Sequence, residues 1–169
     1  MMRAMGLKTL IVGSRGTIAG TVYGTIVVLA SVTAGAKSYE EHPWQLTAIV
    51  GTTVLVLWVA HVYSHGLGRS LEAGRRLTVG ELAAIARAEF SIPLAAVLPM
   101  ALLALGALDV LRERTAVWLA LAVGVATLTA QGVRYAHLEQ LRRAGTLIAV
   151  SVNLALGLAI VALKTFVAH

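Results

Sequence analysis

Long apolar runs separated by short charged segments dominate the chain. Five stretches contain no Asp, Glu, Lys or Arg, and each is at least 19 residues long. A helix needs about 20 apolar residues to cross ~30 Å of hydrocarbon, and backbone groups in lipid must be paired within the segment. The pattern therefore predicts an all-α bundle of about five transmembrane helices. They are expected over 16–36, 44–66, 89–109, 115–134 and 145–166.

Composition supports lipid as the main solvent of this chain. Hydrophobic residues make up 58% of it and charged residues 13%, whereas a soluble domain carries roughly 25% charged residues. No linker divides the sequence, so residues 1–169 are expected to form a single transmembrane domain. Arg outnumbers Lys eleven to three, and Ala, Val, Leu and Gly dominate. This composition is typical of high-GC bacteria, which favours the inner (plasma) membrane as the location of a multi-pass protein.

The basic residues predict the orientation of the helices. With the N-terminus in the cytoplasm, ten Lys and Arg fall on the cytoplasmic side and four on the outer side, in agreement with the positive-inside rule. The ten are Arg3, Lys8, Arg15, Arg69, Arg75, Arg76, Arg87, Arg134, Arg142 and Arg143, and the four are Lys37, Arg112, Arg114 and Lys164. Because this excess lies between apolar runs, lipid headgroups rather than nucleic acid are the expected partners.

The first apolar run has a second interpretation. Basic residues, an apolar segment and then Ala34, Gly35 and Ala36 also resemble a signal peptide with a small-residue cleavage site. Four spans would remain after cleavage. Arg15 interrupts the early apolar residues, so a retained first span is the main prediction.

The longest cytoplasmic loop is expected to contain a short interfacial helix that leads into the third span. Thr78 and Glu81 have the spacing of a capping box, and apolar residues follow at helical spacing. Pro93 and Pro99 then lie within the third span and are expected to kink it.

Small and polar residues within the spans indicate helix packing. Gly16, Gly20 and Gly24 lie on one stripe of the first span, so another helix can approach closely, either within the chain or from a second copy. Asn153 lies near the middle of the last span. It is expected to face the bundle interior and to bond to a neighbouring helix, as structural glue or as part of a pathway.

The second span carries the only ionisable side chains well inside an apolar run. Trp58, His61 and His65 share one helical face, and the two histidines are one turn apart, a spacing at which two imidazoles can bind one metal ion. Glu89 begins the third span at the same depth, and His137 follows the fourth span. A metal site built from His61, His65, Glu89 and His137 is therefore permissible, as is haem ligation by His61 or His65.

Other readings of the histidines remain open. Val62 stands where the metalloprotease motif requires Glu, and membrane di-iron oxidases need more than the five histidines present. Histidines at an interface can also simply bond to backbone or lipid headgroups. No cysteine is present, which removes thiolate sites, and no catalytic residue or cofactor is predicted from a motif.

Two segments, Tyr23–Ser31 and Leu57–His65, resemble uncharacterised small polytopic membrane proteins of high-GC bacteria. The resemblance covers the first two spans and implies a bacterial inner-membrane protein without implying a chemistry.

The leading functional hypothesis is a small non-enzymatic membrane protein. It would be a passive transport or channel-type protein, or an accessory subunit that assembles with itself or with other membrane subunits. Trp58, His61, His65 and Asn153 are the candidate pathway residues. The alternative is a metal- or haem-binding membrane protein that uses His61 and His65.

Overall fold

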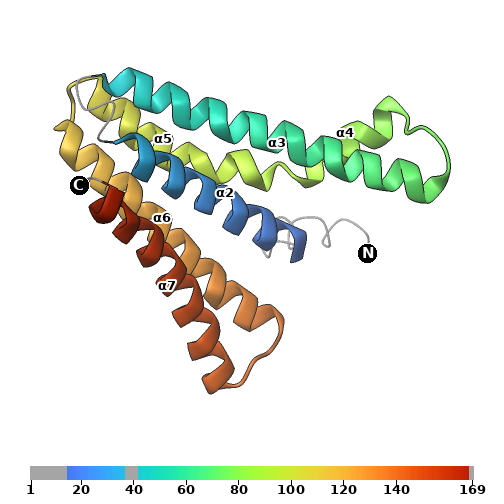
Figure 1. Ribbon diagram of the computed structural model, residues 1–169. Helices are drawn as coiled ribbons and strands as arrows, with labels where there is room; N and C mark the ends of the chain where they lie inside the picture. The colour runs from blue at the N-terminus through green and yellow to red at the C-terminus, as the bar shows by residue number, and fades with distance from the viewer. Residues whose placement is uncertain (1–14, 37–41, 168–169) are drawn as a thin grey trace, which may run out of the picture.

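The computed structural model describes residues 15–36 and 42–167. Within these residues the chain forms six helices and no strand, labelled as in Figure 1. The helices are α2 (Arg15–Gly35), α3 (Pro43–Ala73), α4 (Val79–Ala88), α5 (Ser91–Ala107), α6 (Glu113–Leu138) and α7 (Arg143–Val167). The all-α prediction is confirmed for this part of the chain. Arg3, Lys8 and Lys37, which enter the prediction of orientation, lie outside the described residues.

Four of the helices are long and apolar enough to cross a membrane. They are α2, α3, α6 and α7, and the pair α4 and α5 makes a fifth candidate, with a bend of 48° between the two helices. The predicted number of about five spans is therefore matched by four or five helices in the described residues.

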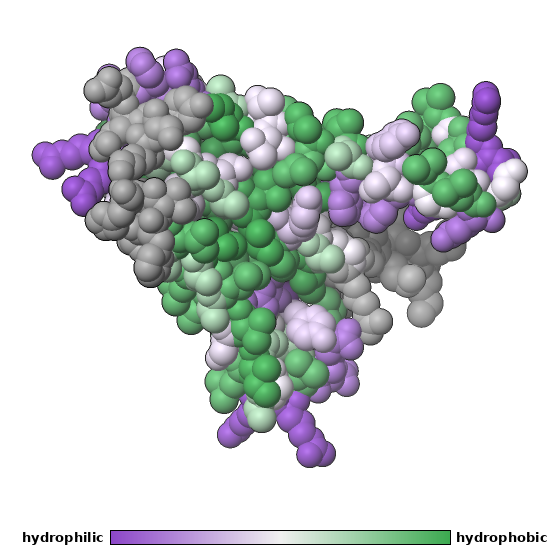
Figure 2. All heavy atoms as spheres, viewed as in Figure 1, coloured by the Kyte–Doolittle hydropathy of each residue, from purple (hydrophilic) through white to green (hydrophobic). Residues whose placement is uncertain are grey.

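The surface of the molecule is also that of a membrane protein. Only 6% of the most apolar window of α7 is buried, and 33% of that of α3. Monomeric soluble proteins rarely expose apolar patches larger than a few hundred Å². In Figure 2, hydrophobic residues cover most of the visible face, and hydrophilic residues gather at the tips of the molecule.

Helix α2 lies at the centre of the bundle and packs against α3, α5, α6 and α7. Helices α5 and α6 are joined at one end of the molecule. From this end, the pair α3 and α5 diverges from the pair α6 and α7, and α2 lies between the two pairs (Figure 1). Val28, Leu29 and Val32 of α2 are at most 1% exposed and sit in the core cluster. Helix α2 therefore supplies the centre of the core, and the signal-peptide interpretation of this run stays a prediction.

Glycines bring α2 into close contact with α5. A Cβ atom on Gly24 would lie 2.4 Å from the carbonyl oxygen of Ile92, and one on Gly20 would lie 2.1 Å from the Ser91 hydroxyl oxygen. Gly16 is exposed. Two of the three glycines in the stripe thus serve packing inside the chain, with the start of α5 as the partner.

Helix α3 is longer than the apolar run that predicted it. It begins at Pro43, in the first turn, where the N–H that proline lacks would have no partner within the helix. It continues through Arg69 and Glu72 to Ala73. Gly74 then ends it in the left-handed conformation, with φ of 61°. At ~1.5 Å per residue, α3 is about 46 Å long and exceeds the ~30 Å of bilayer hydrocarbon.

The short helix before the third span begins where the sequence predicts. The Thr78 side chain accepts a hydrogen bond from the Glu81 backbone N–H, and the Glu81 carboxylate accepts one from the Thr78 backbone N–H. Both bonds of the capping box are therefore present. The interfacial location of this helix stays a prediction.

The bend before α5 lies earlier than the two prolines. Helix α4 ends at Ala88, and α5 starts at Ser91, so Pro93 falls in the first turn and α5 continues through Pro99. The Ile92 N–H donates to the Glu89 carbonyl at 3.1 Å, and Pro93 has no N–H to carry the α4 ladder forward. The break itself occupies Glu89 and Phe90.

Asn153 bonds within its own helix, which differs from the expected bond to a neighbour. Its Nδ2 donates to the Ala149 carbonyl of α7 at 2.9 Å. The side chain nevertheless faces α6, since a Cβ atom on Gly132 would lie 3.2 Å from Nδ2. A backbone carbonyl one turn away satisfies the amide more easily than a partner on α6, where glycine offers no side chain.

Candidate metal centre

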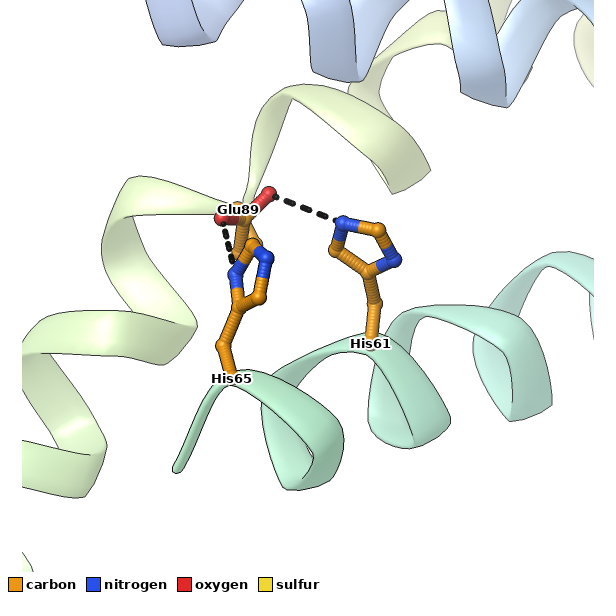
Figure 3. A group of neighbouring side chains, drawn as sticks. All are labelled: His61, His65 and Glu89. Carbon is orange, nitrogen blue, oxygen red and sulfur yellow. Dashed lines mark ion pairs between the residues drawn. The ribbon is translucent and has the colours of Figure 1, made fainter. Parts of the chain in front are cut away.

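Helix α3 and the break between α4 and α5 bring three potential metal ligands together. His61 and His65 lie one turn apart on α3, with ring centroids 4.6 Å from each other. Glu89 is the C-terminal cap of α4. Because the chain leaves the α4 ladder at this residue, its side chain can turn toward α3 (Figure 3).

The Glu89 carboxylate is shared between the two imidazoles. Its Oε1 lies 2.8 Å from Nδ1 of His65, and its Oε2 lies 3.7 Å from Nε2 of His61. Each of the three side chains offers one ligand atom such that all three atoms lie within 4.8 Å of one another. Figure 3 shows both oxygens directed at the rings.

The site is sheltered on the carboxylate side and open on the His65 side. The side chains of Glu89, His61 and His65 are 17%, 33% and 51% exposed. A carboxylate that is withdrawn from water needs cations or hydrogen-bond donors around it. Nδ1 of His65 lies beside the carboxylate at 2.8 Å, Nε2 of His61 lies beyond hydrogen-bond distance at 3.7 Å, and a bound cation would supply positive charge directly.

Aromatic rings fix one imidazole and flank the break. Tyr23 of α2 stacks on His61, with ring centroids 5.3 Å apart. Trp58 meets Phe90 edge to face at 6.2 Å. Helical spacing predicts a shared face for Trp58, His61 and His65, but the contact with Tyr23 depends on how α2 crosses α3. The only indication of this contact in the sequence is that an aromatic residue, Tyr23, lies well inside the first span.

The three ligands lie near the end of the apolar part of α3. Counting ~1.5 Å per residue from Pro43, His61 lies about 27 Å and His65 about 33 Å along the helix axis. These lengths are close to the ~30 Å thickness of bilayer hydrocarbon.

The structure does not bring His137 into this group. Among the described residues, the cluster of potential metal ligands contains His61, His65 and Glu89 alone. His137 is in the last turn of α6, and the ends of α3 and α6 diverge in this direction (Figure 1). Asn153 on α7 likewise lies with α6 rather than with the histidines.

The donor set and its geometry suit a single divalent ion. Zinc ligands lie about 2.0–2.2 Å from the metal, which puts tetrahedral ligand atoms roughly 3.4 Å apart. The three ligand atoms, all within 4.8 Å of one another, lie close to this spacing. Haem ligation by His61 or His65 stays a prediction.

Comparison of the chain with protein-family models, curated proteins and solved structures gave no match.

Proposed function

We propose that this chain is a multi-pass membrane protein that holds a divalent transition-metal ion at its cytoplasmic end. His61, His65 and Glu89 are the protein ligands. The observation that carries the proposal is the convergence of their three ligand atoms within 4.8 Å of one another, from two helices and a helix break.

The placement in the membrane follows the distribution of charge. The N-terminus is assigned to the cytoplasm of a bacterial cell, and the helices α2, α3, α5, α6 and α7 span the plasma membrane. Helix α4, with its charged first turn, lies at the cytoplasmic surface. This arrangement puts ten basic residues inside and four outside, and it opens the metal site toward the cytoplasm.

The ligand types select among ions. Two imidazoles and one carboxylate are the donor set of many Zn²⁺ and Fe²⁺ sites, and the chain has no cysteine to offer a thiolate. Mg²⁺ prefers oxygen ligands in an octahedral arrangement, so it should bind weakly here. The open coordination position can hold water or a ligand from the cytoplasm.

A passive pathway through the bundle receives less support from the residue positions. The candidate pathway residues divide between α3, with Trp58, His61 and His65, and α7, with Asn153. The core cluster defined among the described residues is made of apolar side chains, and buried Thr25 donates its hydroxyl to the Thr21 carbonyl at 2.7 Å. Channel activity stays a prediction.

Metal content is the direct test of the proposal. Untagged protein in mild detergent should take up about one equivalent of Zn²⁺, and Co²⁺ should give a visible d–d spectrum in its place. His61→Ala, His65→Ala and Glu89→Gln should each weaken binding strongly. His137→Ala is the matched control and should bind as the wild type does. A wild-type protein that binds neither ion, or equal binding by Glu89→Gln, would refute the site.

A role as a subunit of a larger assembly is a second candidate, carried by the exposed face of α7. Leu147, Ile148 and Val152 are 60–68% exposed there. We propose that this face meets a second copy or another membrane subunit. Cysteine placed at Ile148 should form a cross-link in native membranes, whereas cysteine at Val97, which is 59% exposed on α5, is the comparison position. Absence of any product at both positions would assign the α7 face to lipid.

A further inference from the structure

Helices α3 and α4 border a long, open apolar groove. Its first part has a volume of about 420 Å³ and is lined by apolar and aromatic residues, among them Trp58, Val62 and Ala83. Its second part, of about 310 Å³, shares Tyr63, Val79 and Leu82 with the first. The two parts therefore form one continuous groove along α3.

The groove ends at a basic residue. Arg76 lines the second part, together with Ser70 and Thr78. The neighbouring Arg75 is neutralised by Glu81, at 2.6 and 3.1 Å from the two guanidinium nitrogens. No ion pair of the Arg76 side chain occurs within the part of the chain that the structure describes. The polar end of the groove thus carries one unneutralised positive charge.

We infer that this groove binds an anionic glycerophospholipid, with an acyl chain between α3 and α4 and the phosphate at Arg76. The charge at the polar end of the groove favours a lipid over a partner helix. Arg76 is the one charged side chain among the described residues that line the groove; it stands at the end beyond the apolar run, and its sign complements a phosphate.

The position of the groove links it to the metal site without making the two depend on each other. Val79, Leu82 and Ala83 line the groove on α4, and the same helix ends at Glu89. The lipid proposal rests on the insertion of this chain in a membrane but not on a bound ion. Failure of one proposal therefore leaves the other standing.

Tryptophan fluorescence in nanodiscs tests the inference. The chain has three tryptophans, and in a variant with Trp44→Phe and Trp118→Phe the groove residue Trp58 is the sole tryptophan, which can be excited apart from the four tyrosines. Brominated phosphatidylglycerol should quench it more effectively than brominated phosphatidylcholine. The expected preference is about five-fold in relative affinity, the ratio that ~1 kcal/mol per arginine near an anionic lipid corresponds to.

Two variants locate the lipid. Arg76→Gln should remove the preference for phosphatidylglycerol, and Arg142→Gln, which removes the same charge on the α6–α7 turn, should retain it. Ala83→Phe should fill the groove and reduce quenching by both lipids. Equal quenching by the two lipids in the parent protein, or an unchanged preference in Arg76→Gln, would overturn the inference. Alkaline extraction of the membranes shows separately whether each variant is inserted.

Discussion

Nδ1 of His65 lies 2.8 Å from Oε1 of Glu89, and this contact joins α3 to the break between α4 and α5. The Glu89 carboxylate is only 17% exposed and faces both imidazoles. Because this carboxylate is already oriented, metal binding loses less conformational entropy in ordering it. The same contact also makes the site sensitive to any movement of α4.

Metal binding should stabilise the folded protein. At a Zn²⁺ concentration one hundred times the Kd, the native state gains about 2.7 kcal/mol by mass action, which raises Tm by roughly 5 °C or more for a chain of this size. A thermal melt in detergent, followed by circular dichroism, measures this shift. Glu89→Gln and His65→Ala should show no shift at the same concentration. An equal shift in these variants would place the stabilising ion elsewhere.

Cysteine labelling should distinguish a site at the membrane edge from a continuous water path. Because the chain has no cysteine, each substitution gives a single reactive thiol. Cysteines at 61 and 65 should react with a water-soluble maleimide, since His61 and His65 are 33% and 51% exposed. Cysteines at Gly51 and Val54 should not react, because both positions are buried. Labelling at all four positions would support a channel instead.

The contact between α2 and α5 should tolerate no side chain at Gly24. Gly24→Ala would drive Cβ against the Ile92 carbonyl, and overpacking of this kind costs roughly 1–3 kcal/mol. Gly68→Ala is the control, because a Cβ atom at Gly68 meets nothing within 4 Å. It should be neutral or should stabilise α3 by up to ~1 kcal/mol. Unfolding titrations in mixed micelles compare the two. A neutral Gly24→Ala would show that the helices are less close.

The N-terminus of α4 should loosen in acid. The hydrogen bond from the Arg75 guanidinium, followed by those from Thr78, lowers the pKa of Glu81 from its ordinary value of 4.5 to about 2. Because the pKa of Glu81 is lower in the folded state, its ionised carboxylate stabilises that state at pH values above the unfolded pKa of 4.5. This contribution is lost as pH falls from 4.5 toward 2. Hydrogen exchange of the α4 amides, corrected for intrinsic rates, should therefore show falling protection over this range.

Variants of two glutamates test the assignment of that pH dependence. Glu81→Gln keeps the size of the side chain and removes its charge, so protection of α4 should be lower at neutral pH and nearly independent of pH. Glu72→Gln removes the same charge from the end of α3 and should behave as the wild type does. A pH dependence that survives in Glu81→Gln would belong to another group.

Asn153 should matter less for stability than the glycine opposite it. Its amide bonds to Ala149 within α7, so Asn153→Ala should cost no more than ~1 kcal/mol, as polar contacts in membrane helices generally do. Gly132→Leu should cost more, because even a Cβ atom there would lie 2.9 Å from the Ala149 carbonyl oxygen. Unfolding of α7 by sodium dodecyl sulfate gives both values. A larger loss for Asn153→Ala would indicate a partner on another helix.

The sequence predicted the helices better than their ends. The absence of charge marks where lipid surrounds a helix, but α3 continues to Ala73 because Arg69, Leu71 and Glu72 favour a helix in water as well. The capping box at Thr78 and Glu81 was predictable because it depends on residues three positions apart. The bend at Glu89 and Phe90 lies at the predicted start of the third span, and a kink at Pro93 and Pro99 within that span stays a prediction.

The candidate site was predictable only where it lies on one helix. Helical spacing puts His61 and His65 on a common face whatever the rest of the chain does. The matching depth of Glu89 followed from counting residues along adjacent spans. The absence of His137 from the cluster depends on the divergence of α6 from α3, and the stacking of Tyr23 on His61 depends on the crossing of α2. Neither crossing is encoded in a local pattern.

The central position of α2 has a consequence for biosynthesis. Of the described helices, α2 leaves the ribosome first, yet its glycine face must wait for α5, which is made only after α3 and α4. At ~5–20 residues per second, this delay is on the order of ten seconds. A stripe of glycines leaves no charge or long side chain exposed to lipid during that time. The glycine face that allows α2 and α5 to pack closely can therefore also face lipid until α5 is inserted.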